Sequence, residues 1–130
     1  MVTSRRKLGD LGERLARKYL EERDYKIVGR NYQKRWGEID LIAEKNKILV
    51  FIEVKTRTKN KSERYGPPEE AVNFSKQRKL IKAARSFLFE NRYPGKTNWQ
   101  IDVIAVELDW RVRRANLRHI KNAVVYDRIR

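Results

Sequence analysis

The sequence contains no cysteine, and this absence excludes several kinds of chemistry at once. A chain without cysteine forms no disulfide bonds, offers no thiolate ligands to zinc and has no thiol nucleophile. The absence is compatible with a reducing compartment.

Long apolar runs are also missing. No segment approaches the about 20 apolar residues that a membrane-spanning helix needs. The N-terminal segment Met1–Lys7 is basic, but an amphipathic rather than an apolar stretch follows it, which is unlike a secretory signal peptide. We therefore expect a soluble, cytoplasmic protein that does not associate with membranes.

Acidic residues are scarce relative to basic ones, with 17 Asp and Glu against 32 Lys and Arg, a net charge of +15. This excess favours a polyanionic partner, nucleic acid first. Ribosomal and membrane-surface proteins share the same balance, so charge alone leaves these classes open. The length of 130 residues predicts one domain, residues 1–130, with a single core.

Hydrophobic periodicity predicts two helices and at least four strands. One helix spans Leu8–Arg23, and a second begins at Ser75 as its N-cap and runs to Asn91. Thr56–Pro68 is expected to be a surface loop. The order α-β-β-β-α-β predicts a mixed α/β domain. The expected strands are Tyr25–Asn31, Glu38–Glu44, Ile48–Lys55 and Trp99–Leu108, with a further one within Arg118–Val125.

The strand Ile48–Lys55 carries the strongest functional pattern. It is apolar on both faces, which is typical of a central buried strand, yet Glu53 and Lys55 share one face near its end. Charged side chains there are unfavourable unless they pair or perform chemistry. A surface salt bridge between Glu53 and Lys55 is the alternative reading.

A second carboxylate lies on the preceding strand. If Asn46 and Lys47 form a two-residue turn, continuing the register places Asp40 directly opposite Glu53, with Cβ atoms about 4.5–5.5 Å apart. Two carboxylates that close repel each other, and a bound Mg²⁺ or Mn²⁺ ion would relieve the repulsion. A shift of one residue would instead put them on opposite faces.

Other candidate residues lie on the two helices. Glu13 borders the buried stripe of the first helix and either adds a carboxylate to the site or is simply solvated. Gln77 continues the buried stripe of the second helix and either faces the site or is an ordinary boundary residue.

No acid occurs between Ala71 and Phe89, so the cations there form a candidate phosphate-binding surface. The candidate nucleic-acid-binding residues are Lys76, Arg78, Lys79 and Lys82, together with Arg35 and Arg57.

Three further residues are less informative. His119, the only histidine, is more typical of a structural or exposed residue than of a general base or zinc ligand. Trp36 either caps the sheet or stacks on a base or ribose. Asp102 is an acid within a strand that the pattern does not assign.

Taken together, these residues resemble the PD-(D/E)XK, or restriction-endonuclease-like, nuclease superfamily. The resemblance is closest to its small bacterial branch of YraN-type proteins, and the superfamily also includes the archaeal Holliday junction resolvases. It rests on ordered motifs across most of the chain. These are Gly12-Glu13, Asn31-Tyr32, Gly37-Glu38-Ile39-Asp40-Leu41-Ile42, Phe51-Ile52-Glu53-Val54-Lys55-Thr56-Arg57, Lys76-Gln77-Arg78 and Asp102-Val103.

The resemblance implies a restriction-endonuclease-like fold, a mixed sheet flanked by helices with a metal site where the central hairpin frays. By position in the motifs, Asp40 and Glu53 match the metal-binding acids and Lys55 the catalytic lysine. Glu13 matches the additional helix acid of the archaeal resolvases, and Gln77 a glutamine found in some relatives. Ile39 stands where the superfamily name has proline.

The resulting hypothesis is an Mg²⁺- or Mn²⁺-dependent DNA endonuclease, with branched or structured DNA as a candidate substrate. Asp40, Glu53, the Val54 carbonyl and Glu13 would hold metal, while Lys55 would orient water and stabilise developing negative charge. Cutting a junction symmetrically would require a homodimer. The alternatives are a nucleic-acid-binding module without catalysis and an RNA-binding or ribosome-associated protein.

Overall fold

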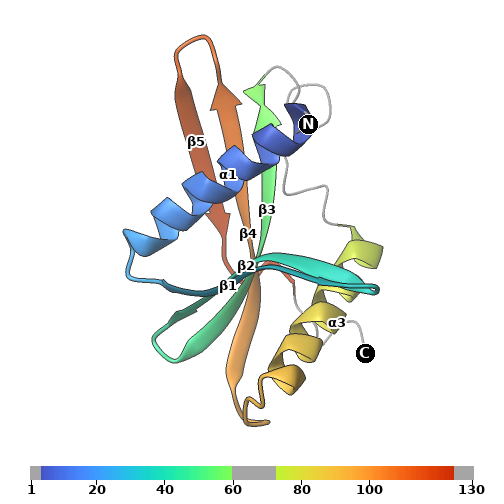
Figure 1. Ribbon diagram of the computed structural model, residues 1–130. Coiled ribbons are helices and arrows are strands. Elements are labelled where there is room, and N and C mark those ends of the chain that lie inside the picture. Colours follow the sequence, from blue (N-terminus) through green and yellow to red (C-terminus); the bar gives the residue numbers. More distant parts are fainter. Residues whose placement is uncertain (1–3, 60–72, 125–130) are drawn as a thin grey trace.

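The computed structural model describes residues 4–59 and 73–124, and its centre is a five-stranded mixed sheet with a helix on each face (Figure 1). This confirms the expected mixed α/β class. The elements are α1 (Ser4–Glu21), β1 (Lys26–Lys34), β2 (Gly37–Lys45), β3 (Ile48–Thr58), α3 (Phe74–Glu90), β4 (Asn98–Asp109) and β5 (Arg114–Ile120).

The strands lie side by side in their order along the chain, β1-β2-β3-β4-β5. The pairs β1–β2, β2–β3 and β4–β5 are antiparallel, whereas β3 and β4 are parallel. Parallel neighbours cannot be joined by a tight turn, and α3 belongs to the crossover between them. The third strand therefore has a partner on each side and occupies the middle of the sheet.

The turn between β2 and β3 fixes the register of the central hairpin. Asn46 and Lys47 both have positive φ angles, 52° and 65°, as a two-residue type I′ turn requires. Lys45 pairs with Ile48, and the same register continues to Leu41 opposite Ile52. The expected register is thus confirmed over these residues, and the regular ladder ends immediately before the two acids.

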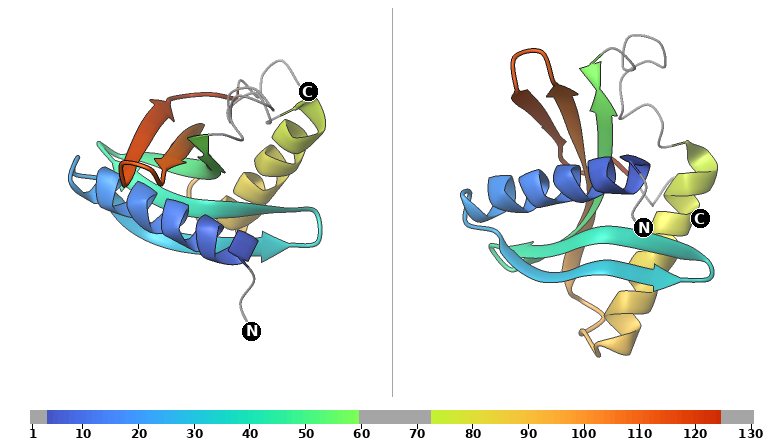
Figure 2. Two further views of the ribbon diagram at one scale, coloured as in Figure 1. Left: turned by 90° about the horizontal axis from the view of Figure 1, so that it is seen from above. Right: turned by 45° about the horizontal axis from the view of Figure 1, so that its top comes forward.

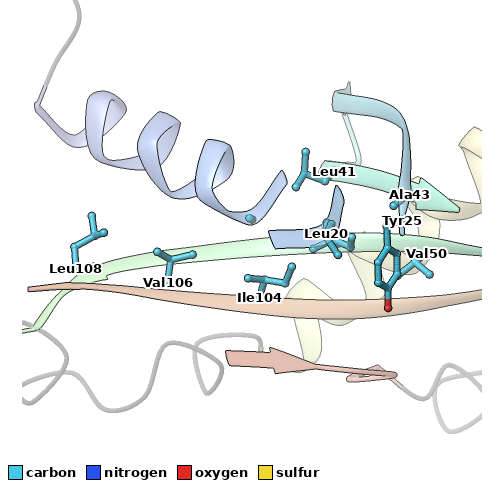
Figure 3. Close-up of a cluster of buried hydrophobic side chains, with 10 residues drawn as sticks. Leu20, Tyr25, Leu41, Ala43, Val50, Ile104, Val106 and Leu108 are labelled. Carbon is cyan, nitrogen blue, oxygen red and sulfur yellow. The ribbon is translucent and has the colours of Figure 1, made fainter. Parts of the chain in front are cut away.

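Helices α1 and α3 lie on opposite faces of the sheet (Figure 2). A hydrophobic cluster packs beneath each of them. Val50 and Ile52 of β3 belong to the cluster that includes Ala16 and Leu20 of α1. Figure 3 labels Val50 and Leu20 among its members. Leu49 and Phe51 face the other way, and the members of their cluster on α3 are Leu80, Ile81, Ala83 and Ala84. The expected alternation of β3 is confirmed, and it directs Glu53 and Lys55 towards α3.

Close contact between α1 and β3 depends on a glycine. A Cβ atom added at Gly12 would overlap the side chain of Thr56, whereas one added at Gly9 would meet no atom within 4 Å. Gly12 therefore lets the helix backbone approach the strand just beyond the candidate site.

Several predicted boundaries were wrong. The first helix spans Ser4–Glu21 rather than Leu8–Arg23, because its polar first turn carries no apolar periodicity. The first strand begins after Tyr25 and extends to Lys34, which pairs with Gly37.

No described helix is long and apolar enough to cross a bilayer.

The second half of the chain also differs from expectation in detail. The cap of α3 is Asn73 rather than Ser75, and its side chain accepts a hydrogen bond of 2.9 Å from the Lys76 N–H. Thr56–Thr58, expected in a loop, continues β3 because these residues pair with β4. The last strand is Arg114–Ile120 instead of Arg118–Val125. The rest of the expected loop, residues 60–68, lies outside the described residues.

Candidate functional site

Asp40 lies where the β2–β3 ladder stops, and its side chain replaces a ladder contact. The Val54 N–H donates a hydrogen bond of 2.8 Å to Asp40 Oδ2. This bond ties the carboxylate of β2 to the backbone next to Glu53 on β3. The predicted proximity of the two acids is therefore produced by a side chain-to-backbone bond at the end of the hairpin. The carbonyl of Val54 remains a predicted metal ligand.

The surroundings of Asp40 disfavour its ionised form. Burial, followed by the negative charge of Glu53, raises the pKa of Asp40 from 3.8 to about 7, and Glu13 and Glu38 add to the increase. The hydrogen bond from Val54 acts in the opposite direction. A site whose carboxylates repel each other in this way favours a bound cation, because positive charge would restore the ionised form.

Two lysines contact the second carboxylate. Glu53, only 5% exposed, has its Oε1 atom 3.3 Å from Lys55 Nζ on the same strand and 2.9 Å from Lys76 Nζ on α3. A salt bridge between Glu53 and Lys55, which was the alternative reading of the sequence, does form, but both side chains are largely buried rather than on the surface. Lys76 joins the strand pair to the helix that packs over it.

The ammonium group of Lys55 is less stable than that of an exposed lysine. Burial and the neighbouring Lys76 lower the pKa of Lys55, and the charge of Glu53 only partly opposes them. A half-buried lysine with a lowered pKa is typical of functional sites as well as of structural ion-pair networks. Its contact with Glu53 fixes where its charge is presented.

Glu13 approaches the same region from α1. Its half-buried side chain hydrogen bonds with Asn31 of β1, and its negative charge contributes to the raised pKa of Asp40. Burial raises the pKa of Glu13 itself, against the attraction of Arg17 and Arg30. The structure thus brings this acid into electrostatic contact with Asp40 from the face opposite α3.

The side chains that could act as ligands decide whether a metal ion fits this site. Asp40 and Glu53 provide the carboxylate oxygens that Mg²⁺ and Mn²⁺ prefer, and burial together with the charge of Glu53 raises the pKa of Asp40, an effect that a bound cation would oppose. Across residues 4–59 and 73–124, His, Asp and Glu side chains form no group of three or more close enough to hold a metal ion. The fit therefore rests on two carboxylates, one of which already contacts two lysines.

The sequence is similar to known proteins over a range that includes the candidate site. The model of the uncharacterised protein family UPF0102 matches residues 12–106, which include all five candidate catalytic residues. The chain belongs to the UPF0102 family.

Individual UPF0102 proteins are similar over most of their length. One from Clostridium beijerinckii is 45% identical over 116 residues, covering 89% of this chain and 91% of the relative. A UPF0102 protein from Geobacter metallireducens is 42% identical over 123 residues, or 95% of this chain and 96% of the relative. One from Alkaliphilus oremlandii is 38% identical over 118 residues, or 91% and 97%.

In this UPF0102 protein, the remaining candidate residues lie on α3, in the β1–β2 turn and on β3. Gln77 is half-buried in the first turn of α3, next to Lys76. Arg78, Lys79 and Lys82 are exposed residues of that helix. Arg35, in the β1–β2 turn, is exposed too, whereas Arg57 is half-buried on β3.

The structure contains a second polar cluster, which the sequence did not predict. Asp102, fully buried on β4, has its Oδ2 atom 2.7 Å from His119 Nε2 on β5, and the Tyr19 hydroxyl is 3.1 Å from His119 Nδ1. Asp102 Oδ1 accepts hydrogen bonds from Gln100 and the Asn122 backbone. The sequence did contain one sign of this cluster: Asp102 stands between the apolar residues Ile101 and Val103 of a strand, and a buried acid requires hydrogen-bond partners. The cluster supports the structural reading of His119.

Proposed function

We propose that this protein is a metal-dependent DNA endonuclease with a restriction-endonuclease-like fold. The proposal rests on one observation: Asp40, Glu53 and Lys55 lie together at the end of the central hairpin, where the regular pairing stops. There, burial and repulsion between two carboxylates raise the pKa of Asp40 to about 7 beside a lysine whose pKa is lowered. The basic outer side of α3 supports a polyanionic substrate.

Asp40 and Glu53 would hold the ion, with Glu13 and the Val54 carbonyl as further candidate ligands. When bound, Mg²⁺ or Mn²⁺ supplies Lewis-acid chemistry, which polarises a phosphate and lowers the pKa of a water molecule. Lys55, held by Glu53 at 3.3 Å, orients water and places positive charge where negative charge develops on the phosphate. Gln77 would contact water or phosphate from α3.

A cleavage assay tests the proposal. Purified protein is incubated with Mg²⁺ or Mn²⁺ and a panel of Holliday junction, flap, single-stranded and linear duplex DNA, and RNA. We expect cleavage of a DNA substrate, and we expect Asp40→Asn, Glu53→Gln and Lys55→Ala each to reduce the rate by about 100-fold or more.

Matched controls separate chemistry from general charge. Glu44→Gln and Lys47→Ala change exposed residues of the same hairpin away from the site, and both should cleave at the wild-type rate. Cleavage that survives all three site substitutions, or no cleavage of any substrate, would contradict the proposal.

A second candidate function, nucleic-acid binding without catalysis, is favoured by one specific contact. The Lys76 ammonium lies 2.9 Å from Glu53 Oε1 and neutralises this carboxylate without a metal ion. Thermal unfolding distinguishes the two functions: a metal site raises the melting temperature with Mn²⁺, and Asp40→Asn should abolish the rise. No shift with Mn²⁺, together with DNA binding that survives the site substitutions, would favour the binding function.

A further inference from the structure

A pocket of about 490 Å³ adjoins the candidate site, between the tip of the β1–β2 hairpin and the start of α3. Lys34, Arg35 and Trp36 line it from the hairpin, and Lys76 and Lys79 line it from the helix. Its volume lies within the about 300–1,000 Å³ typical of small-molecule sites. The pocket is therefore large enough for a nucleotide but not for an intact duplex.

The charge and position of the pocket suit a phosphate. Among the described residues that line it, four are Lys or Arg and one, Glu38, is acidic. Lys76 is shared with the candidate site, because its Nζ atom also contacts Glu53 Oε1 at 2.9 Å. A strand with one phosphate at Asp40 and Glu53 would thus have a neighbouring nucleotide within reach of the pocket.

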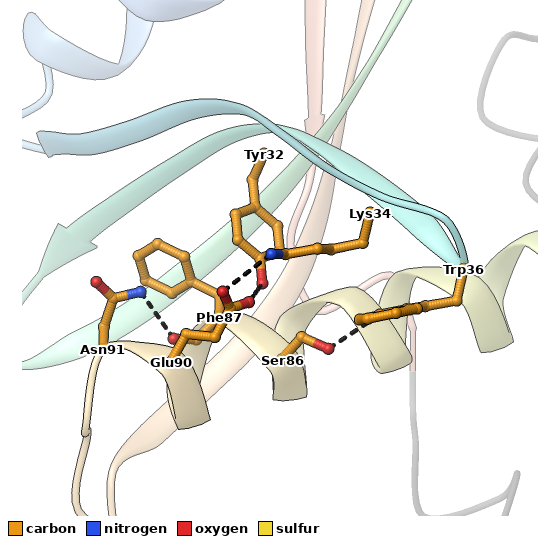
Figure 4. A network of polar contacts seen from close by, with 7 residues as sticks. All are labelled: Tyr32, Lys34, Trp36, Ser86, Phe87, Glu90 and Asn91. Atoms are coloured by element: carbon orange, nitrogen blue, oxygen red, sulfur yellow. Dashed lines mark hydrogen bonds and ion pairs between the residues drawn. The ribbon is translucent and has the colours of Figure 1, made fainter.

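The indole of Trp36 is held in a defined orientation. Trp36 Nε1 donates a hydrogen bond of 2.9 Å to Ser86 Oγ on α3, while the side chain remains 38% exposed (Figure 4). An exposed aromatic ring with a fixed orientation is suited to stacking on a nucleobase. Within a paired duplex both faces of each internal base are already stacked, so this ring would favour an unpaired base.

The hairpin tip that carries Trp36 is itself fixed on the helix. A Cβ atom at Gly37 would lie 2.6 Å from the carbonyl oxygen of Lys79, so hairpin and helix backbones are in close contact. Further along, Lys34 Nζ lies 2.9 Å from Glu90 Oε2, and the Tyr32 hydroxyl also hydrogen bonds with Glu90 (Figure 4). These contacts maintain the distance between the two walls of the pocket.

We infer that this pocket binds an unpaired nucleotide of a DNA strand, with the base against Trp36 and a phosphate near Lys76 and Lys79. The inference rests on the proposed function, because it names the substrate class of the same site. DNA with a single-stranded overhang or flap is the preferred ligand, and a blunt duplex is bound only through its backbone.

Binding measured in EDTA tests the inference without cleavage. The affinity for a duplex with a short single-stranded overhang is compared with that for the blunt duplex of the same sequence, by fluorescence anisotropy. We expect about tenfold tighter binding of the overhang, the size of effect that stacking one base on an aromatic ring produces. Trp36→Ala should remove this preference and leave blunt-duplex affinity unchanged.

Two further variants make the result decisive. Trp36→Phe keeps an aromatic ring and should retain part of the preference, whereas Trp110→Ala removes another exposed tryptophan and should leave the preference intact. Equal wild-type affinity for the two ligands, or an equal loss for both in Trp36→Ala, would overturn the inference.

The pocket and the proposed catalysis can fail separately. Cleavage in Mg²⁺ without any overhang preference would overturn the pocket and support the proposed function. An overhang preference that depends on Trp36, with no cleavage of any substrate, would support the pocket and contradict the nuclease.

Discussion

Asp40 connects the acidic site to the stability of the whole fold. Its pKa is raised from 3.8 to about 7, so the folded chain holds a proton that the unfolded chain releases at lower pH. This stabilising contribution is complete below about pH 4 and is lost as the pH rises towards and through about 7. At higher pH, folding must bury an ionised Asp40 beside Glu53.

We therefore predict that Asp40→Asn is more stable than wild type at pH 8 in EDTA. One pKa unit corresponds to about 1.4 kcal/mol, and allowing for relaxation of the site we expect a difference of about 1–3 kcal/mol. The asparagine oxygen can still accept the hydrogen bond from Val54. Urea denaturation at pH 4 and pH 8 measures the effect, and an equal loss of stability at both values would contradict it.

His119 has a structural role that can also be measured. It faces the fully buried Asp102 on one side and Tyr19 on the other. His119→Ala would remove one partner of a buried carboxylate and should lower the free energy of unfolding by about 2–3 kcal/mol.

An exposed neighbour provides the control for this substitution. Asn116→Ala, on the same strand, should change the stability by no more than about 0.5 kcal/mol. Urea denaturation of the two variants at neutral pH makes the comparison. Equal stabilities would mean that the buried cluster contributes little to the fold.

At the scale of elements, the position of α1 on β3 depends on Gly12. The added methyl group of Gly12→Ala would collide with Thr56 and displace the helix, and with it Glu13. We expect a loss of about 1–3 kcal/mol, as for other overpacked contacts.

Gly9→Ala is the matched control in the same helix. A Cβ atom there meets nothing within 4 Å, so the variant should gain about 0.5–1 kcal/mol from helix propensity. Thermal unfolding of both variants measures the difference. Equal melting temperatures would show that α1 does not need to approach β3 this closely.

The local parts of this architecture could be predicted from the sequence. The Asn46-Lys47 turn set the hairpin register, and alternating apolar residues assigned the faces of β3. These features depend on residues close together in the chain. The register placed Asp40 opposite Glu53, but the regular pairing ends at Leu41 and Ile52, and the Val54 N–H bond that holds Asp40 beside Glu53 was not predicted.

Contacts between distant segments could not be predicted in the same way. Lys76 was expected on the phosphate-binding surface, but its contact with Glu53 depends on where α3 crosses the sheet. Asp102 and His119 meet because β4 pairs with β5, whose boundary was placed too late in the chain. No periodicity in the sequence encodes such crossing angles.

At the scale of the whole molecule, the net charge of +15 predicts that the proposed nucleic-acid binding depends strongly on salt. Releasing counterions from duplex DNA contributes about 0.9 to the slope of log K against log salt for each phosphate contact. We predict that Arg78→Ala and Lys82→Ala each reduce the magnitude of this slope by about 0.9, with equal effects on different DNA sequences.

Lys96→Ala provides the matched control for these variants. Lys96 is exposed on the connection between α3 and β4, beyond the opposite end of α3 from the pocket. Fluorescence anisotropy over a series of salt concentrations gives the slopes. An unchanged slope in both helix variants, or an equal change in Lys96→Ala, would contradict the assignment of the basic surface to α3.

The two-residue turn between β2 and β3 has a consequence for the order in which the protein assembles. The hairpin is local and forms quickly, so Asp40 and Glu53 meet early in folding. Lys76, which neutralises Glu53, arrives only when α3 packs, and parallel β4 must then pair across a long crossover. Glu53 therefore meets Asp40 with Lys55 beside it but before Lys76 arrives, and a nascent chain that ends before α3 carries the two acids with only one of the two lysines that contact Glu53.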